Sequence, residues 1–184
     1  MRVISGFLKG RNIKGDKIKG TRPTMDKIKQ SVFAMIQDDV RESTCLDLFA
    51  GSGSLGIEAI SNGASSTYFI DKGKEAYDTI KYNIEQFNIE NQSKVFHDDY
   101  MKMLLYFKNN NIQFNLIFLD PPYKENLIEE VLTFISNNNL LYPYGQVICE
   151  FSDEILDDEY GNLSVIKQRL YGDKQVKIYI NRNV

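Results

Sequence analysis

The sequence predicts an α/β fold built around one mostly parallel β-sheet. From residue 44 onward, short apolar runs alternate with segments whose apolar residues recur at helical spacing. A cluster of glycines follows the first apolar run, as is typical of a strand-to-helix turn. The last two strand-like runs flank Tyr171-Gly172-Asp173-Lys174, a hairpin-type turn that predicts antiparallel pairing at the end of the sheet. With 184 residues, the chain can bury one main core and carry a small extension.

Residues 1–42 are predicted to form that extension. Val3 to Phe7 and Asn12 to Ile18 are strand-like and flank a glycine turn, so they predict a basic β-hairpin. An amphipathic helix with Thr24 as its N-cap follows, reaches about Gln37, and leads into a polar linker.

Residues 43–184 are predicted to form the main domain. Its strand–helix alternation predicts a seven-stranded, mostly parallel sheet with an antiparallel last strand. The expected strands are 44–49, 66–70, 93–97, 114–119, 146–151, 163–170 and 175–180, and the expected helices are 54–62, 74–87, 101–108 and a segment around 127–135.

Charge is distributed unevenly along the chain. Residues 1–29 hold nine Lys or Arg against two Asp, a net charge of +7, so the remaining residues carry −10. A basic arm on an acidic body favours a polyanionic partner, because Lys and Arg displace counterions from phosphates. The alternative is a solvated hairpin whose lysines serve solubility. Because no apolar run approaches membrane-spanning length, we expect a soluble, cytoplasmic protein with no membrane contact.

The segment from Asp47 to Gly56 indicates a cofactor site. Gly51, Gly53 and Gly56 allow a tight turn and close approach of the backbone to a ligand at a helix N-terminus. Asp71 ends the next strand, where a carboxylate can accept hydrogen bonds from both ribose hydroxyls. These features predict an adenosine-containing cofactor, either a nicotinamide dinucleotide or S-adenosylmethionine.

Three acidic positions at strand ends favour S-adenosylmethionine. Asp47 would repel a pyrophosphate but attract the ammonium of a methionyl group, and Asp98-Asp99 offers an acceptor for the adenine amino group. The stiff loop Asp120-Pro121-Pro122-Tyr123 ends a further strand and has no evident use in a dinucleotide fold. Read alone, each is also explained structurally: Asp47 as a cap, Asp98-Asp99 as a helix start and the prolines as a turn.

Together these motifs resemble class I S-adenosylmethionine-dependent methyltransferases that act on exocyclic amino groups, which have a Rossmann-like sheet. Further segments narrow the resemblance to bacterial small-subunit ribosomal RNA guanine-N2 methyltransferases. These segments are Met1-Arg2-Val3-Ile4-Ser5-Gly6, Lys9-Gly10-Arg11, Thr21-Arg22-Pro23-Thr24, Leu46-Asp47-Leu48-Phe49-Ala50-Gly51-Ser52-Gly53 and Tyr171-Gly172-Asp173. The chain departs from the family at Asp71, where Glu is usual, and at Tyr100, where a small residue is usual.

The resemblance implies transfer of a methyl group to guanine N2 in small-subunit (16S) ribosomal RNA, within a particle or assembly intermediate. The catalytic residues would be Asp120, Pro121, Pro122 and Tyr123. The cofactor-binding residues would be Asp47, Phe49, Ala50, Gly51, Ser52, Gly53, Asp71, Asp99 and Tyr100. The RNA-binding residues would be Arg2, Lys9, Arg11, Arg22 and Lys27, and Lys29 is a further candidate for phosphate contact.

Other functions remain open from the residues alone. The acceptor could be another RNA or DNA base or a protein glutamine, and the chain could also be a non-catalytic RNA-binding module. No metal is expected, because Cys45 and Cys149 lie inside strand-like runs and His97 is the single histidine.

Overall fold

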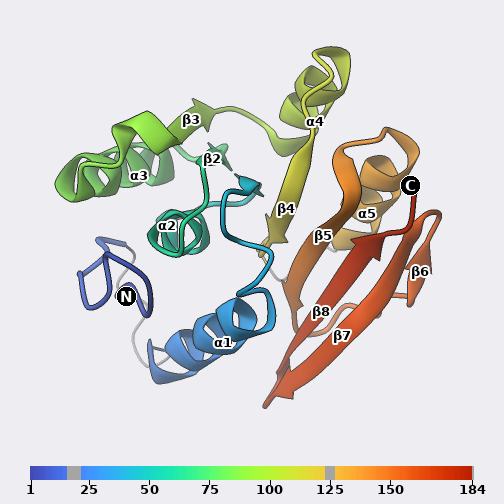
Figure 1. Cartoon of the computed structure of the whole chain (residues 1–184), viewed down its shortest axis with the longest axis horizontal. Coiled ribbons are helices and arrows are strands. Elements are labelled where there is room, and N and C mark those ends of the chain that lie inside the picture. The colour runs from blue at the N-terminus through green and yellow to red at the C-terminus, as the bar shows by residue number, and fades with distance from the viewer. Residues whose placement is uncertain (16–21, 123–126, 184) are drawn as a thin grey trace.

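The computed structural model describes residues 1–15, 22–122 and 127–183, with the side chains of residues 22–24 left undescribed (Figure 1). One sheet has the strand order β3-β2-β1-β4-β5-β8-β7-β6. Its strands are β1 (Thr44–Asp47), β2 (Ser66–Asp71), β3 (Ser93–His97), β4 (Phe114–Leu119), β5 (Leu141–Phe151), β6 (Glu159–Tyr160), β7 (Leu163–Tyr171) and β8 (Lys174–Asn181). The helices are α1 (Arg22–Met35), α2 (Ser54–Ser61), α3 (Lys74–Phe87), the 3₁₀ turn η1 (Glu90–Gln92), α4 (Tyr100–Asn109) and α5 (Ile128–Asn137).

The predicted α/β architecture with a mostly parallel sheet is confirmed. Strands β3, β2, β1, β4 and β5 pair in parallel, and β8 runs antiparallel to both β5 and β7. The predicted number of seven strands is wrong, because β6 adds an eighth that pairs antiparallel with β7. A two-residue strand is too short to show the alternation on which a sequence prediction depends.

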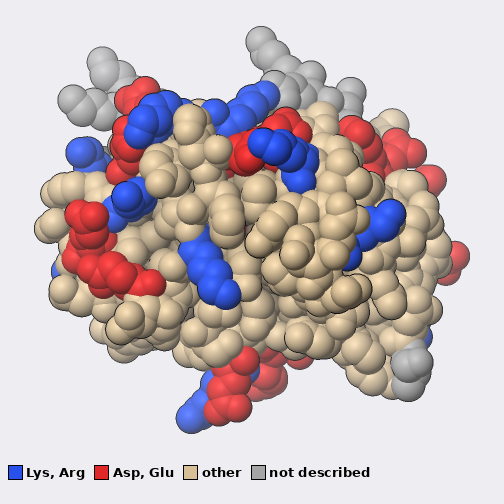
Figure 2. All heavy atoms as spheres, turned by 90° about the horizontal axis from the view of Figure 1, so that it is seen from above, with Lys and Arg blue, Asp and Glu red and all other residues tan. Residues whose placement is uncertain are grey.

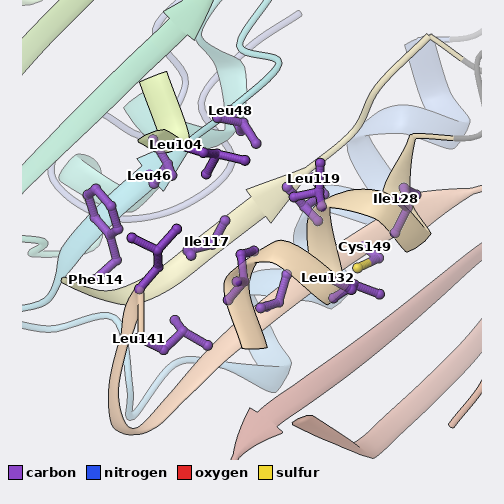
Figure 3. Close-up of a cluster of buried hydrophobic side chains, with 14 of the residues drawn as sticks. Leu46, Leu48, Leu104, Phe114, Ile117, Leu119, Ile128, Leu132, Leu141 and Cys149 are labelled. Atoms are coloured by element: carbon purple, nitrogen blue, oxygen red, sulfur yellow. The ribbon is translucent and has the colours of Figure 1, made fainter. Parts of the chain in front are cut away.

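Helices cover both faces of the sheet because successive residues of the central strands point to opposite sides. Ile117 and Leu119 of β4 join the buried cluster that contains α4 and α5, and Figure 3 shows them facing Leu132 of α5. Leu116 and Phe118 pack on the other face with α1. Strand β4 is therefore buried on both faces, as a central parallel strand should be.

The two largest differences in element boundaries lie at the starts of α1 and β5. Helix α1 begins at Arg22, so Thr24 lies within the helix and is not its N-cap. Strand β5 begins at Leu141, which pairs with Phe114, and the register then shifts before Gln146 pairs with Leu116. The intervening Pro143 and Gly145 resemble a turn in the sequence, which explains why the strand was expected to begin at Gln146.

The predicted N-terminal hairpin is confirmed only around its turn. Arg2 and Asn12 form an antiparallel bridge, and the N–H groups of Val3, Gly10 and Ile13 donate to the carbonyls of Arg11, Val3 and Met1. The expected second strand, 12–18, extends past residue 15 and so lies partly outside the described residues. Beyond this pairing, the backbone N–H groups of Ile4 and Ser5 donate to the Glu58 carboxylate of α2. Phe7 likewise donates its N–H to the Ser61 carbonyl. The expected strand therefore ends near Val3, because a buried carboxylate is a stronger acceptor than a strand carbonyl.

Glu58 anchors the N-terminal segment through a buried ion pair. Its side chain is fully buried, and Oε2 lies 3.1 Å from the Lys29 Nζ of α1. Lys29 Nζ also donates to the Arg2 carbonyl at 2.7 Å and to the Ser54 hydroxyl at 2.9 Å. One carboxylate and one ammonium thus connect the N-terminal segment, α1 and α2.

The predicted division into residues 1–42 and 43–184 stays a prediction. Val3, Leu8 and Ile13 share a buried cluster with Ile57 of α2 and Ile80 of α3, so the first residues pack closely against the main sheet and its helices. None of the described helices combines the length and apolarity that crossing a membrane requires.

Replacing Glu58 with Ala should lower the free energy of unfolding by about 3–5 kcal/mol, because it leaves the Lys29 ammonium buried without its counter-charge. Urea unfolding measures the change. The matched control is Asp78→Ala, which removes an exposed ion pair with Lys74 and should cost less than about 1 kcal/mol. Equal losses in the two variants would contradict the anchoring role.

Candidate active site

A cavity of about 540 Å³ lies at the carboxyl ends of β1, β2, β4 and β5. Parallel strands end at one edge of the sheet, and the order β2-β1-β4 changes direction at β1, where open α/β sheets bind ligands. The residues that line the cavity include Asp47, Phe49, Ala50, Gly51, Ser52, Asp71, Asp98, Tyr100, Asp120, Pro121, Pro122, Glu150 and Lys174. Most of the residues predicted for the cofactor and the acceptor therefore lie together.

The turn between β1 and α2 depends on its glycines. Gly51 and Gly53 have φ values of 55° and 80°, in the left-handed region that favours glycine. At Gly56 an added Cβ would lie 2.3 Å from Phe69 Cε1, so this glycine permits close packing of α2 on β2. Gly53 is the N-cap residue of α2 and is not among the cavity-lining residues, so its contribution is to shape the turn.

Asp47 is buried at the end of β1, with 2% of its surface exposed. Its Oδ2 accepts a hydrogen bond from the Gly56 N–H at 2.9 Å. Burial raises the pKa of Asp47 to about 7; the Gly56 N–H opposes this rise and the charge of Asp71 adds to it. A cation next to this carboxyl group would stabilise its ionised form. The sequence predicts that the ammonium of a methionyl group takes this place.

Asp71 fixes the first glycine of the turn from the end of β2. Its Oδ2 accepts from the Gly51 N–H at 2.8 Å and its Oδ1 from the Gly73 N–H at 2.7 Å. These bonds orient the carboxylate at the cavity wall. Each oxygen retains acceptor capacity, which suits the predicted contact with ribose hydroxyls.

The predicted adenine acceptor Asp99 is the N-cap of α4. Its Oδ1 accepts from the N–H groups of Met101 at 2.9 Å and Lys102 at 3.3 Å. Its neighbour Asp98 lines the cavity, and Asp99 does not. The sequence could not separate the two adjacent acids, because only the direction of the chain as it enters α4 decides which one faces the cavity.

Two aromatic side chains flank the same end of the cavity. The rings of Phe49 and Tyr100 lie 5.2 Å apart between centroids, and the Tyr100 hydroxyl donates to Glu130 Oε2 at 3.2 Å. They offer apolar surface to a flat ring.

Asp120, Pro121 and Pro122 follow β4 and line the cavity, and Tyr123 lies outside the described residues. Burial raises the pKa of Asp120 well above its usual value, and the charges of Glu150 and Asp47 raise it further. Lys174 opposes the rise. Asp120 thus sits among charged groups from the neighbouring strand ends.

Sequence reasoning missed Glu150 and Lys174, which line the cavity as an ion pair 2.5 Å apart. Glu150 lies near the carboxyl end of β5, so the strand-end rule that selected Asp120 would also have found it. Lys174 begins β8, and no strand-end rule applies to an antiparallel partner.

None of the predicted RNA-binding residues with described side chains lines the cavity, and they differ in exposure and contacts. Lys9 and Lys27 are exposed, whereas Arg2 pairs with Asp26 at 3.3 Å. Arg11 donates to the Gln86 carbonyl at 2.6 Å and lies over the Phe87 ring. Arg22 begins α1, but its side chain is not described.

Lys29 is the least exposed of the candidate cations whose side chains the structure describes, because it is 5% exposed and paired with Glu58. Burial lowers the pKa of Lys29, and the carboxylate of Glu58 opposes this change. On the face shown in Figure 2, cations and anions are interspersed and no continuous cationic area covers it.

The residues present fit S-adenosylmethionine better than a dinucleotide. Acidic side chains outnumber basic ones around the cavity: Asp26, Asp47, Asp71, Asp98, Asp120 and Glu150 against Lys29, Lys72 and Lys174. Such a lining attracts a sulfonium and an ammonium and repels a pyrophosphate. Within the described part of the chain, no three His, Cys, Asp or Glu residues form a group that could hold a metal ion.

The sheet order, the glycine turn and the acidic strand ends are those of a class I S-adenosylmethionine-dependent methyltransferase, and S-adenosylmethionine is its cofactor. More particularly, the chain belongs to the family described as "Conserved hypothetical protein 95", which matches residues 1–180.

Relatives and solved structures agree with this assignment. The chain is 39% identical over 183 residues to the "Putative rRNA methyltransferase YlbH" of Bacillus subtilis, covering 99% of this chain and 100% of YlbH. It is 32% identical over 190 residues to the "Ribosomal RNA small subunit methyltransferase D" of Haemophilus influenzae, covering 98% of this chain and 94% of the relative. The crystal structure of the "putative methylase HI0767" from Haemophilus influenzae superimposes with a TM-score of 0.82 at 28% identity, covering 99% of this chain and 98% of the other.

The free energy of unfolding should fall as the pH rises from about 4 to about 7. Because the pKa of Asp47 is raised from 3.8 to about 7, the folded chain in this window keeps a proton that the unfolded chain releases. The loss from this residue is at most about 4 kcal/mol. Asp47→Asn should remove this pH-dependent loss of stability while keeping an acceptor for the Gly56 N–H. Urea unfolding at pH 5 and pH 8 measures the difference, and parallel pH curves for the two proteins would contradict the buried, protonated state.

Proposed function

We propose that this protein transfers a methyl group from S-adenosylmethionine to the exocyclic N2 of a guanine in small-subunit ribosomal RNA. The observation that carries the proposal is the position of Asp120-Pro121-Pro122 in the same cavity as Asp47, Asp71 and the glycine turn. The rRNA methyltransferase names of the relatives support the class of substrate.

The chemical problem is the poor nucleophilicity of the acceptor, since the lone pair of an exocyclic amino group is delocalised into the ring. The cofactor supplies the methyl group as an electrophile activated by its positive sulfur. Asp120 and the Pro121 carbonyl would accept the two amino hydrogens, so that the nitrogen pyramidalises and its lone pair becomes directed. The two prolines restrict the backbone that holds both acceptors.

The ionised form of Asp120 is the stronger acceptor for such a hydrogen bond. Burial and the neighbouring carboxylates raise its pKa in the cavity, whereas amino donors and a cationic cofactor act in the opposite direction. The cavity would therefore favour the ionised, accepting form of Asp120 when both ligands are present. As the nitrogen gains the methyl group it becomes acidic, and Asp120 or water takes its proton.

Separate groups would hold the acceptor base and the RNA backbone. Tyr123 would stack on a base turned out of its helix or loop, and Arg2, Lys9, Arg11, Arg22 and Lys27 would contact phosphates. We propose a substrate that presents the nucleotide ready-folded, such as a small-subunit particle or an assembly intermediate in the cytoplasm.

Labelled methyl transfer to ribosomal RNA from cells that lack the protein tests the proposal. Nucleoside analysis should find N2-methylguanosine in the small-subunit RNA, and assays on naked RNA and on assembled particles should identify the substrate. Label in another base, in DNA or in protein would redirect the function, and RNA binding without transfer would indicate a non-catalytic module.

Replacing Asp120 with Ala should lower kcat at least about 100-fold, because the acceptor that orients the amino group is lost. Calorimetric titration with S-adenosylhomocysteine should show nearly unchanged affinity, since the cofactor residues lie on other strands. Equal loss of both properties would argue against an acceptor role. Asp120→Asn, which keeps the shape but changes two acceptors to one acceptor and one donor, should also be inactive.

Replacing Lys9 and Arg11 together with Met should weaken RNA binding and flatten its dependence on salt. Each phosphate contact contributes about 0.7–0.9 to the slope of log K against log salt, so two lost contacts lower it by about 1.5. Lys108→Met, at the exposed end of α4, is the matched control and should leave the slope unchanged. Filter binding at several salt concentrations measures it; an unaltered slope in the double variant would exclude these residues as phosphate contacts.

A further inference from the structure

We propose that Glu150 and Lys174 read the Watson–Crick edge of the acceptor base and select guanine. This inference rests on the proposed function, in which Asp120 holds the exocyclic amino group. It assigns the choice of base to two residues that neither the sequence prediction nor the comparisons singled out.

Pairing across three neighbouring strands sets the order of these side chains. Leu119, the last residue of β4, pairs in parallel with Cys149 of β5, so Asp120 leaves the end of β4 beside Glu150 of β5. Both side chains line the cavity. Lys174 begins β8, the antiparallel neighbour of β5. The charged groups therefore follow one another along the sheet edge as Asp120, Glu150 and Lys174.

The Glu150–Lys174 pair is largely withdrawn from water and lines the cavity with Asp120. Lys174 Nζ lies 2.5 Å from Glu150 Oε1, and each side chain is 14% exposed. A buried ion pair is weak as a stabilising device, because desolvation offsets most of its attraction. A carboxylate has about four acceptor positions and an ammonium three donors, so such a pair can also bind a polar ligand.

Asp120 and Glu150 are hydrogen-bond acceptors and Lys174 is a donor, and this order is complementary to guanine. Along its Watson–Crick edge guanine presents the N2 amino group, the N1–H donor and the O6 acceptor in sequence. With N2 at Asp120, N1–H would donate to Glu150 and O6 would accept from Lys174. In adenine and cytosine the ring nitrogen next to the amino group is an acceptor, and it would face the Glu150 carboxylate. A site built to pair a donor strongly rejects a base that lacks it.

The electrostatics of the cavity agree with this assignment. Glu150 raises the pKa of Asp120 and Lys174 lowers it, so the adjacent carboxylates repel one another and Lys174 offsets part of the repulsion. Among the described residues, Asp47 of β1 also acts on Asp120 and raises its pKa. The two adjacent donors of guanine would relieve the repulsion between Asp120 and Glu150, which a base with a single donor there cannot do.

Substituting 2-aminopurine for the modified guanine in the RNA tests the assignment. This base keeps the exocyclic amino group, but its N1 is an acceptor and it has no O6. The wild-type protein should favour guanine in kcat/KM. Glu150→Gln and Lys174→Met should each lower kcat/KM on guanine RNA by about 10- to 100-fold with a much smaller loss on 2-aminopurine RNA, so the preference falls.

Conservative and distant variants separate base reading from folding. Lys174→Arg keeps a donor and should retain most of the preference, and Lys74→Met, which breaks an equally short ion pair outside the cavity, should leave it unchanged. S-adenosylhomocysteine should bind to every variant with wild-type affinity.

Two failures can be told apart. If the wild-type protein transfers no methyl group to guanine N2, the proposed function fails. If it does, but Glu150→Gln and Lys174→Met lose activity equally on both RNAs or lose none, the base-reading role is overturned. A lowered preference in both variants with cofactor binding intact supports it.

Discussion

Parallel pairing of the central strands is the constraint on which the site depends. It brings the ends of β1, β2, β4 and β5 to one edge, and with them the carboxyl groups of Asp47, Asp71, Asp120 and Glu150. Gathering acids in a partly buried cavity costs free energy, which shows in the raised pKa values of Asp47 and Asp120. Backbone N–H groups and Lys174 offset part of this cost. A cationic cofactor would offset more, so the same repulsion makes the cavity selective for its ligand.

The buried Glu58–Lys29 pair serves the fold in a different way. It holds residues 1–15 against α2, next to the glycine turn, and Asn83 of α3 reinforces this by bonding both the Lys14 backbone and the Ser52 carbonyl. The segment expected to contact RNA and the turn expected to contact the cofactor are therefore joined by shared side chains. Compared with a well-packed apolar pair, such an ion pair adds little net stability, but removing one partner is costly. The pair therefore favours the one arrangement of the N-terminal segment, α1 and α2 in which both charges are paired.

Much of the fold could be predicted, because local patterns determine it. Alternating strands and helices, the hairpin-type turn before Lys174 and the glycine turn all appeared where expected. The N-terminal hairpin is narrower than expected because Ile4 and Ser5 donate to a carboxylate distant in sequence. The adjacent acids Asp98 and Asp99 look alike until the path of the chain into α4 is known. Both limits share one cause: the partner of a polar group is decided by packing, not by periodicity.

The sequence by itself determined the fold class, the strand ends that hold the acids and the class of cofactor, since periodicity of 2 or 3.6 residues and glycine conformation are local properties. Only the tertiary structure decided that Lys29 is buried against Glu58, and that Glu150 and Lys174 stand beside Asp120. Those contacts join residues far apart in the chain. Packing of α1 against α2 determines the first contact and the strand order β4-β5-β8 the second, and no local pattern encodes either.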